Sequence, residues 1–221
     1  NIVAAEEQEA RRLPGSIAIY RAGHSLASGN MQATVRYAQQ ALELSSEEDY
    51  LQRGAAAALL ALVAWSNGDL KEACRFYPES IERLQRAGHI TDAIGCTLSL
   101  ADICITQGRL REAMSTYEQG LQLAMAHGGL VLRGAADMHV GMSELHREQN
   151  DLQSATQHLL KSRELGEFTG LPQNRYRWRV AMARIQEAQG QLDSALELLR
   201  EAEQLYTSDF SPDVRPVSAL R

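Results

Sequence analysis

Three arginines near residue 180 are the side chains in this sequence best suited to binding a ligand. Arg175, Arg177 and Arg184 lie within ten residues of one another. Guanidinium groups bind carboxylates and phosphates through two parallel hydrogen bonds. One interpretation is therefore an anion clamp, with nearby aromatic surface from Tyr176 and Trp178.

The competing interpretation is a network of ion pairs with no ligand. Asp137, Glu144 and Glu187 could pair with these arginines if their helices are neighbours. Stacked-helix proteins often pair charges between adjacent helices. We therefore favour the ion network over the clamp.

Histidine and cysteine residues offer little evidence of a metal or redox site. His139 and His146 are seven residues apart, which places them on about the same face of one helix. Zinc needs at least three protein ligands, and no third ligand stands in obvious register, so we expect no zinc site. Cys74, Cys96 and Cys104 lack metal-ligand spacing. Buried small hydrophobes in a reducing compartment are a better interpretation of them than a redox switch.

The remaining composition argues for a binding protein. No Ser or Cys has a His and a carboxylate in credible register, and neither G-x-x-x-x-G-K-[ST] nor G-x-G-x-x-G occurs. We therefore expect no enzymatic activity and no cofactor in this segment. The formal charge of −6 disfavours binding to nucleic acid. Polar residues interrupt the chain too often for a membrane span.

A repeated motif reveals how these residues must be positioned. NGDLKEA at 67–73 recurs as QGRLREA at 107–113 and as QGQLDSA at 189–195, with weaker copies at 28–34 and 149–155. The turn residues of the five copies are Gly29, Gly68, Gly108, Asn150 and Gly190, separated by 39, 40, 42 and 40 residues. Gly and Asn most easily adopt positive φ, so we expect one helix to end and another to begin at each copy.

Small residues recur in step with these turns. They occupy the positions seven before, five after and twelve after each turn residue in all five copies. In that order they are Ala22, Ala61, Ala101, Ser143, Ala183; Thr34, Ala73, Ala113, Ala155, Ala195; and Ala41, Ser80, Gly120, Ser162, Ala202. Helix axes come within about 8–10 Å only where side chains are small. The pattern therefore predicts antiparallel helix pairs.

The offsets resemble those of the tetratricopeptide repeat (TPR), although that repeat has about 34 residues and this one about 40. Gly88, Gly128 and Gly170 each follow their own turn by 20 residues. We therefore expect second helices of about 18 residues. Pro14 and Pro172 are expected in the first turns of first helices, and residues 45–48 are expected to begin another.

The predicted fold is all-α: a right-handed α-solenoid of about five TPR-like helix pairs, truncated at both ends. The predicted divisions are 1–13 (end of a preceding repeat), 14–46, 47–88, 89–129, 130–170 and 171–208 (repeats 1 to 5), and 209–221 (start of a further helix).

Several longer stretches resemble a narrower family, the MalT-like, LuxR-family ATP-dependent transcriptional regulators. The stretches include LPGSIAIYRA at 13–22, ELHREQNDL at 144–152, NRYRWRVAMARI at 174–185 and DFSPDVRPVSAL at 209–220. The resemblance implies a cytoplasmic multidomain switch. In that switch a nucleotide-binding module would precede this segment and a DNA-binding helix-turn-helix would follow it.

In TPR arrays the first helices line a concave groove, here through positions 13, 10, 6 and 3 before each turn. This register predicts an apolar first half of the groove and a charged second half. The candidate binding residues are Trp65, Asp102, Asp137, Glu144, Arg147, Arg175, Arg177 and Arg184. Trp65 and Trp178 are better interpreted as core or rim residues than as sugar-stacking platforms.

The leading functional prediction is a module that binds a protein or small-molecule effector in this groove and regulates transcription. The alternative is an adaptor or co-chaperone module that binds a peptide there. The absence of Lys and Asn from the groove positions counts against the adaptor. Apolar end faces also predict end-to-end association with a second copy.

Overall fold

The computed structural model describes residues 2–126, 133–166 and 170–208. Within these ranges the regular elements are ten α-helices, and no strand occurs. The helices are α1 (Ile2–Ala27), α2 (Met31–Leu44), α3 (Tyr50–Ser66), α4 (Leu70–Arg86), α5 (Ile90–Thr106), α6 (Leu110–Met125), α7 (Ala135–Glu148), α8 (Leu152–Leu165), α9 (Asn174–Ala188) and α10 (Leu192–Ser208).

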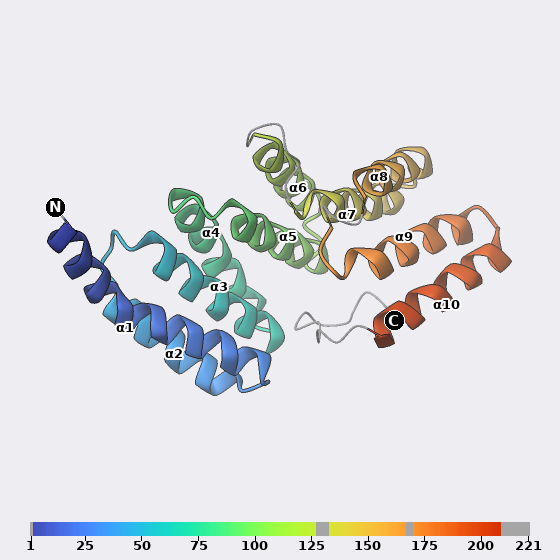
Figure 1. Ribbon diagram of the computed structural model, residues 1–221. Helices are drawn as coiled ribbons and strands as arrows, with labels where there is room; N and C mark the ends of the chain where they lie inside the picture. The colour runs from blue at the N-terminus through green and yellow to red at the C-terminus, as the bar shows by residue number, and fades with distance from the viewer. Residues whose placement is uncertain (1, 127–132, 167–169, 209–221) are drawn as a thin grey trace. The chain divides into compact units, whose positions relative to one another are not determined.

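The chain divides into two compact units, Asn1–Cys96 and Thr97–Arg221, which we call the N-terminal and C-terminal units. In the N-terminal unit α1 pairs with α2, α3 packs against both of them, and α3 pairs with α4. In the C-terminal unit α7 pairs with α8 and α9 pairs with α10. Helix α9 also contacts both α7 and α8 (Figure 1). Each unit is thus built from stacked antiparallel helix pairs, as the repeat pattern predicts.

The five predicted turn residues all adopt positive φ. The angles are 72°, 80° and 72° at Gly29, Gly68 and Gly108, 60° at Asn150 and 78° at Gly190. Each turn is closed by the same two backbone hydrogen bonds, one donated by the turn residue and one by its successor. This shared geometry confirms the turns predicted from the motif.

Side chains that follow the turns stabilise the starts of three second helices. The side chains of Asn30, Asp69 and Asp151 accept hydrogen bonds from backbone N–H groups three residues on, at 3.0, 3.1 and 3.0 Å. Each bond satisfies a donor that the helix leaves unpaired, worth about 1 kcal/mol. The motif therefore encodes both the end of one helix and the start of the next.

The small residues lie where the helices meet. All fifteen predicted positions are buried. Ala61, Ala101 and Ala183, seven residues before their turns, are 0, 0 and 1 % exposed. Larger side chains at these positions would force the paired helices apart. The register of the repeat is therefore confirmed.

Proline positions were predicted less well. The separate helix expected to begin at Pro14 is wrong, because Pro14 lies inside the continuous helix α1. A proline removes one backbone hydrogen bond from a helix, and tertiary packing can offset that loss; Pro78 lies inside α4 in the same way. Pro172 precedes the first residue of α9 by two positions.

The predicted length of the second helices is correct for one repeat and wrong for another. Helix α4 has 17 residues and ends just before Gly88, whose φ is 76°. Helix α8 has only 14 residues, because Gly166 adopts a φ of 77° and ends it before Gly170. Gly170 instead allows a close approach, since a Cβ there would lie 2.8 Å from that of Asn174.

One further expected helix start can be compared with the structure, and two other expectations cannot. The helix start expected at residues 45–48 is wrong, because the N-cap of α3 is Asp49, whose carboxylate binds the N–H and hydroxyl of Ser46. The turn expected at Gly128 and the helix expected over 209–221 lie outside the described residues.

Candidate functional site

A buried charged group joins three helices of the C-terminal unit. The hydroxyl of Tyr117 on α6 donates to Asp102 Oδ1 on α5 at 2.6 Å, and Arg177 Nη2 on α9 donates to the same oxygen at 3.1 Å. The side chains of Asp102 and Arg177 are only 17 % and 16 % exposed. We call these three residues the Asp102 cluster.

The environment of the Asp102 cluster holds its charges in place. Burial, followed by the Asp102 carboxylate, raises the pKa of Tyr117, so the phenol remains a hydrogen-bond donor. Burial alone would lower the pKa of Arg177, but the carboxylates of Asp102 and Asp137 raise it overall. The arginine therefore stays charged and its ion pair persists at physiological pH.

A glycine makes room for the phenol ring of this cluster. A Cβ at Gly141 on α7 would overlap the ring of Tyr117. The nearby pair of Gly120 and Met138 has the same relation, since a Cβ at Gly120 would overlap the Met138 side chain. Gly141 thus lets α7 approach α6 closely with the Tyr117 ring between them.

A second charged group, the Glu144 cluster, joins α7 and α9. Glu144 Oε2 accepts hydrogen bonds from Arg184 Nη1 at 2.9 Å and from Arg147 Nη2 at 3.3 Å. The three side chains are 22, 33 and 24 % exposed, so solvent reaches this cluster more easily than the other. Arg147 also forms an ion pair with Glu148.

The structure thus pairs two of the three predicted arginines with carboxylates, as the ion-network interpretation expects. The partner of Arg177 is Asp102 rather than Asp137. Asp137 is 1 % exposed, and its Oδ2 accepts a hydrogen bond from the backbone N–H of Leu171 at 2.7 Å. It therefore ties α7 to the segment before α9 and does not face a groove.

Two other residues predicted to bind a ligand, Trp65 and Arg175, belong to neither cluster. Trp65 is 6 % exposed and packs edge-on against Tyr77, with ring centroids 6.4 Å apart. Arg175 is exposed at the start of α9, where its carbonyl accepts a hydrogen bond from Arg179. Trp178, like Trp65, has a structural contact, because its Nε1 donates to the carbonyl of Leu159 at 2.8 Å.

A histidine that sequence reasoning missed completes a group of three. His158 on α8 places its Nδ1 2.9 Å from that of His139, and its ring stacks on that of His146 with centroids 5.2 Å apart. Burial, then His139, His146 and Lys161, lower the pKa of His158 to about 4. Among the described residues no set of three or more His, Cys, Asp or Glu side chains has the geometry of a metal site.

The sequence alone does not show that His158 belongs with the other two histidines. His158 lies eight residues after the turn at Asn150, and only the pairing of α7 with α8 brings it to the other two. Cys96 and Cys104 are buried and Cys74 is half-buried, and no disulfide joins any of the three. Burial raises the pKa of Cys96 to about 11, which makes it unreactive.

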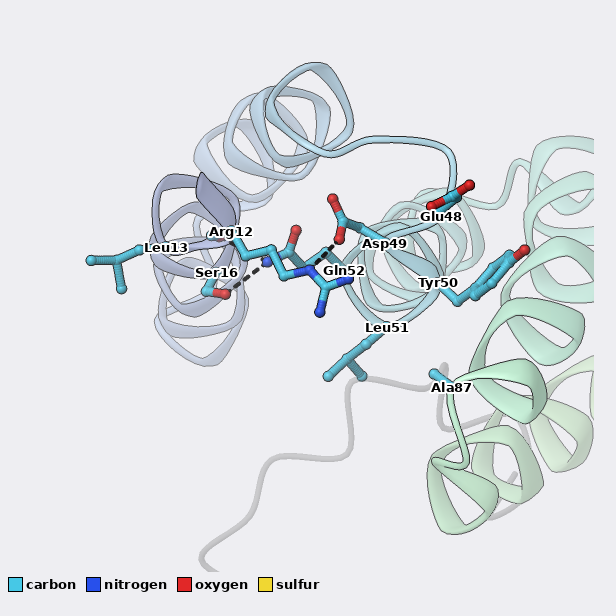
Figure 2. Close-up of a pocket in the computed structure, with 9 residues that line it drawn as sticks. All are labelled: Arg12, Leu13, Ser16, Glu48, Asp49, Tyr50, Leu51, Gln52 and Ala87. Atoms are coloured by element: carbon cyan, nitrogen blue, oxygen red, sulfur yellow. Dashed lines mark hydrogen bonds and ion pairs between the residues drawn. The ribbon is translucent and has the colours of Figure 1, made fainter. Parts of the chain in front are cut away.

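The N-terminal unit contains a cleft of about 450 Å³ between α1 and the start of α3, with Ala87 at one side (Figure 2). Gln52 Nε2 donates to the carbonyl of Arg12 and to Ser16 Oγ, each at 2.8 Å. Arg12 forms an ion pair with Asp49 at 2.6 Å. Burial opposes ionisation of Asp49, but hydrogen bonds from Ser46 and the charge of Arg12 lower its pKa overall.

Comparison with known proteins identifies the family of this chain. The sequence model of the MalT-like TPR region matches residues 15–221. The chain belongs to this family. No curated protein matches the sequence of this MalT-like TPR region. No helix in the described ranges is both long and apolar enough to cross a membrane.

Solved structures resemble this MalT-like TPR region in fold at low sequence identity. BtubC (BKLC) from P. vanneervenii superposes with a TM-score of 0.70 at 14 % identity, covering 93 % of this chain and 85 % of that one. A putative kinesin light chain with TPR-like repeats from Podosopora anserina gives 0.60 at 19 %, covering 88 % and 96 %. MamA from Desulfovibrio magneticus gives 0.58 at 12 %, covering 90 % and 98 %. The fold is a TPR-like α-solenoid, a scaffold suited to protein interaction.

Proposed function

We propose that this MalT-like TPR region senses a protein or small-molecule effector and belongs to a bacterial transcriptional regulator. The longer protein would bind ATP and DNA through other domains and act in the cytoplasm. The present chain would bind its effector without catalysing a reaction. The family match supports this proposal, as does the absence of catalytic motifs from the sequence.

The observation that carries the proposal is the way ion pairs connect first helices of different repeats. Arg177 on α9 reaches Asp102, which is 75 residues earlier on α5, and Arg184 reaches Glu144, 40 residues earlier on α7. Stacked repeats otherwise interact mainly with their nearest neighbours. These contacts therefore couple the positions of three first helices.

A ligand that exchanged with one member of a cluster would change that coupling. An anion could replace Glu144 on Arg184, because this pair is partly exposed. The helices would then lose a constraint that holds them in register. An effector that prefers the released arrangement would shift the population toward it, and attached domains could respond to that shift.

The proposal is tested by thermal unfolding of the chain with sugars, metabolites and acidic peptides. A ligand at a hundred times its dissociation constant should stabilise the fold by about 2.7 kcal/mol and raise the midpoint. The variant Arg184→Gln should lose the response. Arg179→Gln, which removes an arginine paired with Glu201 on the exposed surface of α9, should keep it.

Two results would contradict the proposal. One is that no compound or peptide raises the midpoint of the native chain. The other is that Arg184→Gln responds as strongly as the native chain. A separate part of the proposal is that other domains of the longer protein bind DNA and ATP. Binding of DNA or ATP by this chain alone would contradict that part.

The cleft of the N-terminal unit favours a second candidate function, that of an adaptor for peptides. Arg12, Ser16 and Gln52 supply polar groups at its wall, and Leu13 and Leu51 supply apolar surface. A peptide with an acidic end would fit this combination. Micromolar binding of such a peptide, lost in Gln52→Ala, would favour the adaptor over the effector sensor.

A further inference from the structure

Three histidines meet between helices α7 and α8 of the C-terminal unit. His139 and His146 lie on α7 and His158 lies on α8, and these two helices form one antiparallel pair (Figure 1). The chain has six histidines, so half of them gather at this one place. All three are half-buried, so an ion in solution can reach them.

The packing of a helix pair does not require histidine at these positions. His139 lies 11 residues before its turn residue and His158 lies eight after it. In the first repeat the same positions hold Ala18 and Tyr37, and Tyr37 packs against the apolar cluster that contains Ala18. The second repeat likewise has an alanine and a phenylalanine there. A small residue and an aromatic ring thus fill this space elsewhere, and the fourth repeat places ring nitrogens in it instead.

The two nearest imidazoles, those of His139 and His158, face each other through their Nδ1 atoms, which lie 2.9 Å apart. Between neutral rings this distance suits one hydrogen bond, donated by one Nδ1 and accepted by the other. The distance also suits two ligands of one metal ion. Imidazole nitrogens bind at about 2.0–2.1 Å, so two of them at this separation subtend an angle of about 90° at the ion. Cu²⁺ and Ni²⁺ prefer ligands at 90°, whereas tetrahedral zinc would hold them about 3.3 Å apart.

Both imidazoles are in the protonation state that binds metal ions. Burial, followed by the charge of Lys161, lowers the pKa of His139. Burial, followed by the neighbouring histidines and Lys161, lowers the pKa of His158 to about 4. Neutral imidazole is the form that coordinates a metal. In the complex the ring that donates the hydrogen bond would hold its proton on Nε2 instead, which leaves both Nδ1 atoms free to coordinate.

His146 is a neighbour of this pair rather than a third ligand. Its ring is nearly parallel to that of His158, at an angle of 19°, with centroids 5.2 Å apart. In this stacked position its nitrogens do not point at the space between the other two rings. The part of the chain that the structure describes offers no set of three or more His, Cys, Asp or Glu side chains with metal-site geometry. Water molecules would therefore complete the coordination.

We propose that His139 and His158 bind one Cu²⁺ or Ni²⁺ ion through their Nδ1 atoms and that the ion ties α7 to α8. The site lies within one helix pair and does not depend on the effector proposed above. The ammonium group of Lys161 on α8 opposes the ion, because it lies near enough to influence both imidazoles. Removal of this charge should therefore strengthen binding.

The test is isothermal titration of the untagged chain with Ni²⁺ at pH 7, together with electron paramagnetic resonance of its Cu²⁺ complex. One ion should bind per chain. The Cu²⁺ spectrum should show coupling to two imidazole nitrogens. Bound Ni²⁺ should also raise the thermal midpoint of the chain, because the unfolded chain does not hold the two nitrogens together.

Variants locate the ion. His139→Gln and His158→Gln should each weaken Ni²⁺ binding at least about tenfold, because each removes one of the two protein ligands. His89→Gln is the matched control: His89 is an exposed histidine of the N-terminal unit that pairs with Asp92, and this variant should bind like the native chain. Lys161→Gln should bind Ni²⁺ about threefold more tightly. A gain of affinity cannot come from unfolding, so this variant remains informative if a histidine variant fails to fold.

Three outcomes would overturn the proposal. The native chain could show no saturable binding of Ni²⁺ or Cu²⁺ up to about 1 mM. Binding could persist at native strength in both His139→Gln and His158→Gln, which would place the ion elsewhere. The Cu²⁺ spectrum could show a single nitrogen, which would indicate an adventitious ion only.

Discussion

The two units use the same repeat register but hold their first helices in different ways. In the N-terminal unit the buried core between α1, α2 and α3 is a cluster of alanines with one leucine, and polar contacts of Gln52 and Arg12 lie beside it where α1 meets the start of α3. In the C-terminal unit the corresponding helices enclose the Asp102 cluster, the Glu144 cluster and three neighbouring histidines.

This difference shows that the backbone pattern of the repeat does not dictate the chemistry between its helices. Alanine contacts depend on close packing and respond weakly to pH and salt. A buried polar cluster stabilises only when every member has its partner, so it responds strongly to the loss of one. We therefore expect the C-terminal unit to be the more sensitive to substitution and pH.

The largest effect should follow Asp102→Ala, which leaves the Arg177 guanidinium buried without its carboxylate. We expect the C-terminal unit to lose about 3 kcal/mol of unfolding free energy. Trp178 reports on this unit in a Trp65→Phe background, and Trp65 reports on the N-terminal unit in a Trp178→Phe background. Urea unfolding followed by fluorescence should show the larger loss with the Trp178 reporter.

The control for this substitution is Glu201→Ala, which removes an ion pair with Arg179 on the surface of the same unit. Exposed ion pairs contribute little, so its unfolding curve should nearly overlay that of the native chain. Equal effects of the two substitutions would refute the special role of the Asp102 cluster.

Substitution of glycine by alanine should have opposite signs in the two units. At Gly141 a methyl group would overlap the ring of Tyr117, so we expect a loss of about 2 kcal/mol. At Gly23 on α1 a methyl group meets nothing within 4 Å, so Gly23→Ala should stabilise by about 0.5–1 kcal/mol. Urea midpoints of the two variants check the prediction, and a shared sign would contradict it.

The histidine group should make stability depend on pH. The folded pKa of His158 is about 4, well below its ordinary value of 6.5. Between these pH values the unfolded chain binds a proton and the folded chain does not, so stability is full above pH 6.5 and falls as the pH drops toward 4. Because the side chain is half-buried, the loss should be modest.

This pH dependence is measured by urea unfolding at intervals between pH 7 and pH 4. It should be weaker in His158→Gln, which cannot take up the proton. It should appear with the Trp178 reporter more than with the Trp65 reporter. A profile that His158→Gln leaves unchanged would assign the effect to other groups.

The smallest effect is expected at the one repeat turn that lacks glycine. Asn150 adopts a φ of 60°, where a side chain costs some energy. Asn150→Gly should therefore stabilise the C-terminal unit by about 0.5 kcal/mol or less. A larger change in urea midpoint would mean that this turn, rather than the charged clusters, distinguishes the two units.

Local features of the fold could be predicted because they depend on residues close together in the chain. The motif around Gly68 encodes a turn, an N-cap at Asp69 and a buried Ala73, all within six residues. Pro14 was predicted wrongly for the same reason: its local preference was outweighed by helix α1 as a whole. Gly166 was missed because Gly170 fitted the expected spacing better.

The partners of the site could be predicted only in part. Arg184 and Glu144 share a groove register on adjacent first helices, and the structure pairs them. Asp102 belongs to the same register but lies two repeats from Arg177, and a rule of nearest neighbours does not connect them. His158 lies outside that register altogether.

The amino-acid sequence by itself determined the helical class, the repeat, its turns and the small residues at the helix crossings. Backbone conformation and helix pairing depend on spacing along the chain, and that spacing is visible in the sequence. Only the tertiary structure decided which charges meet. The position of one helix against another depends on angstrom-scale packing, such as the space that Gly141 leaves for Tyr117.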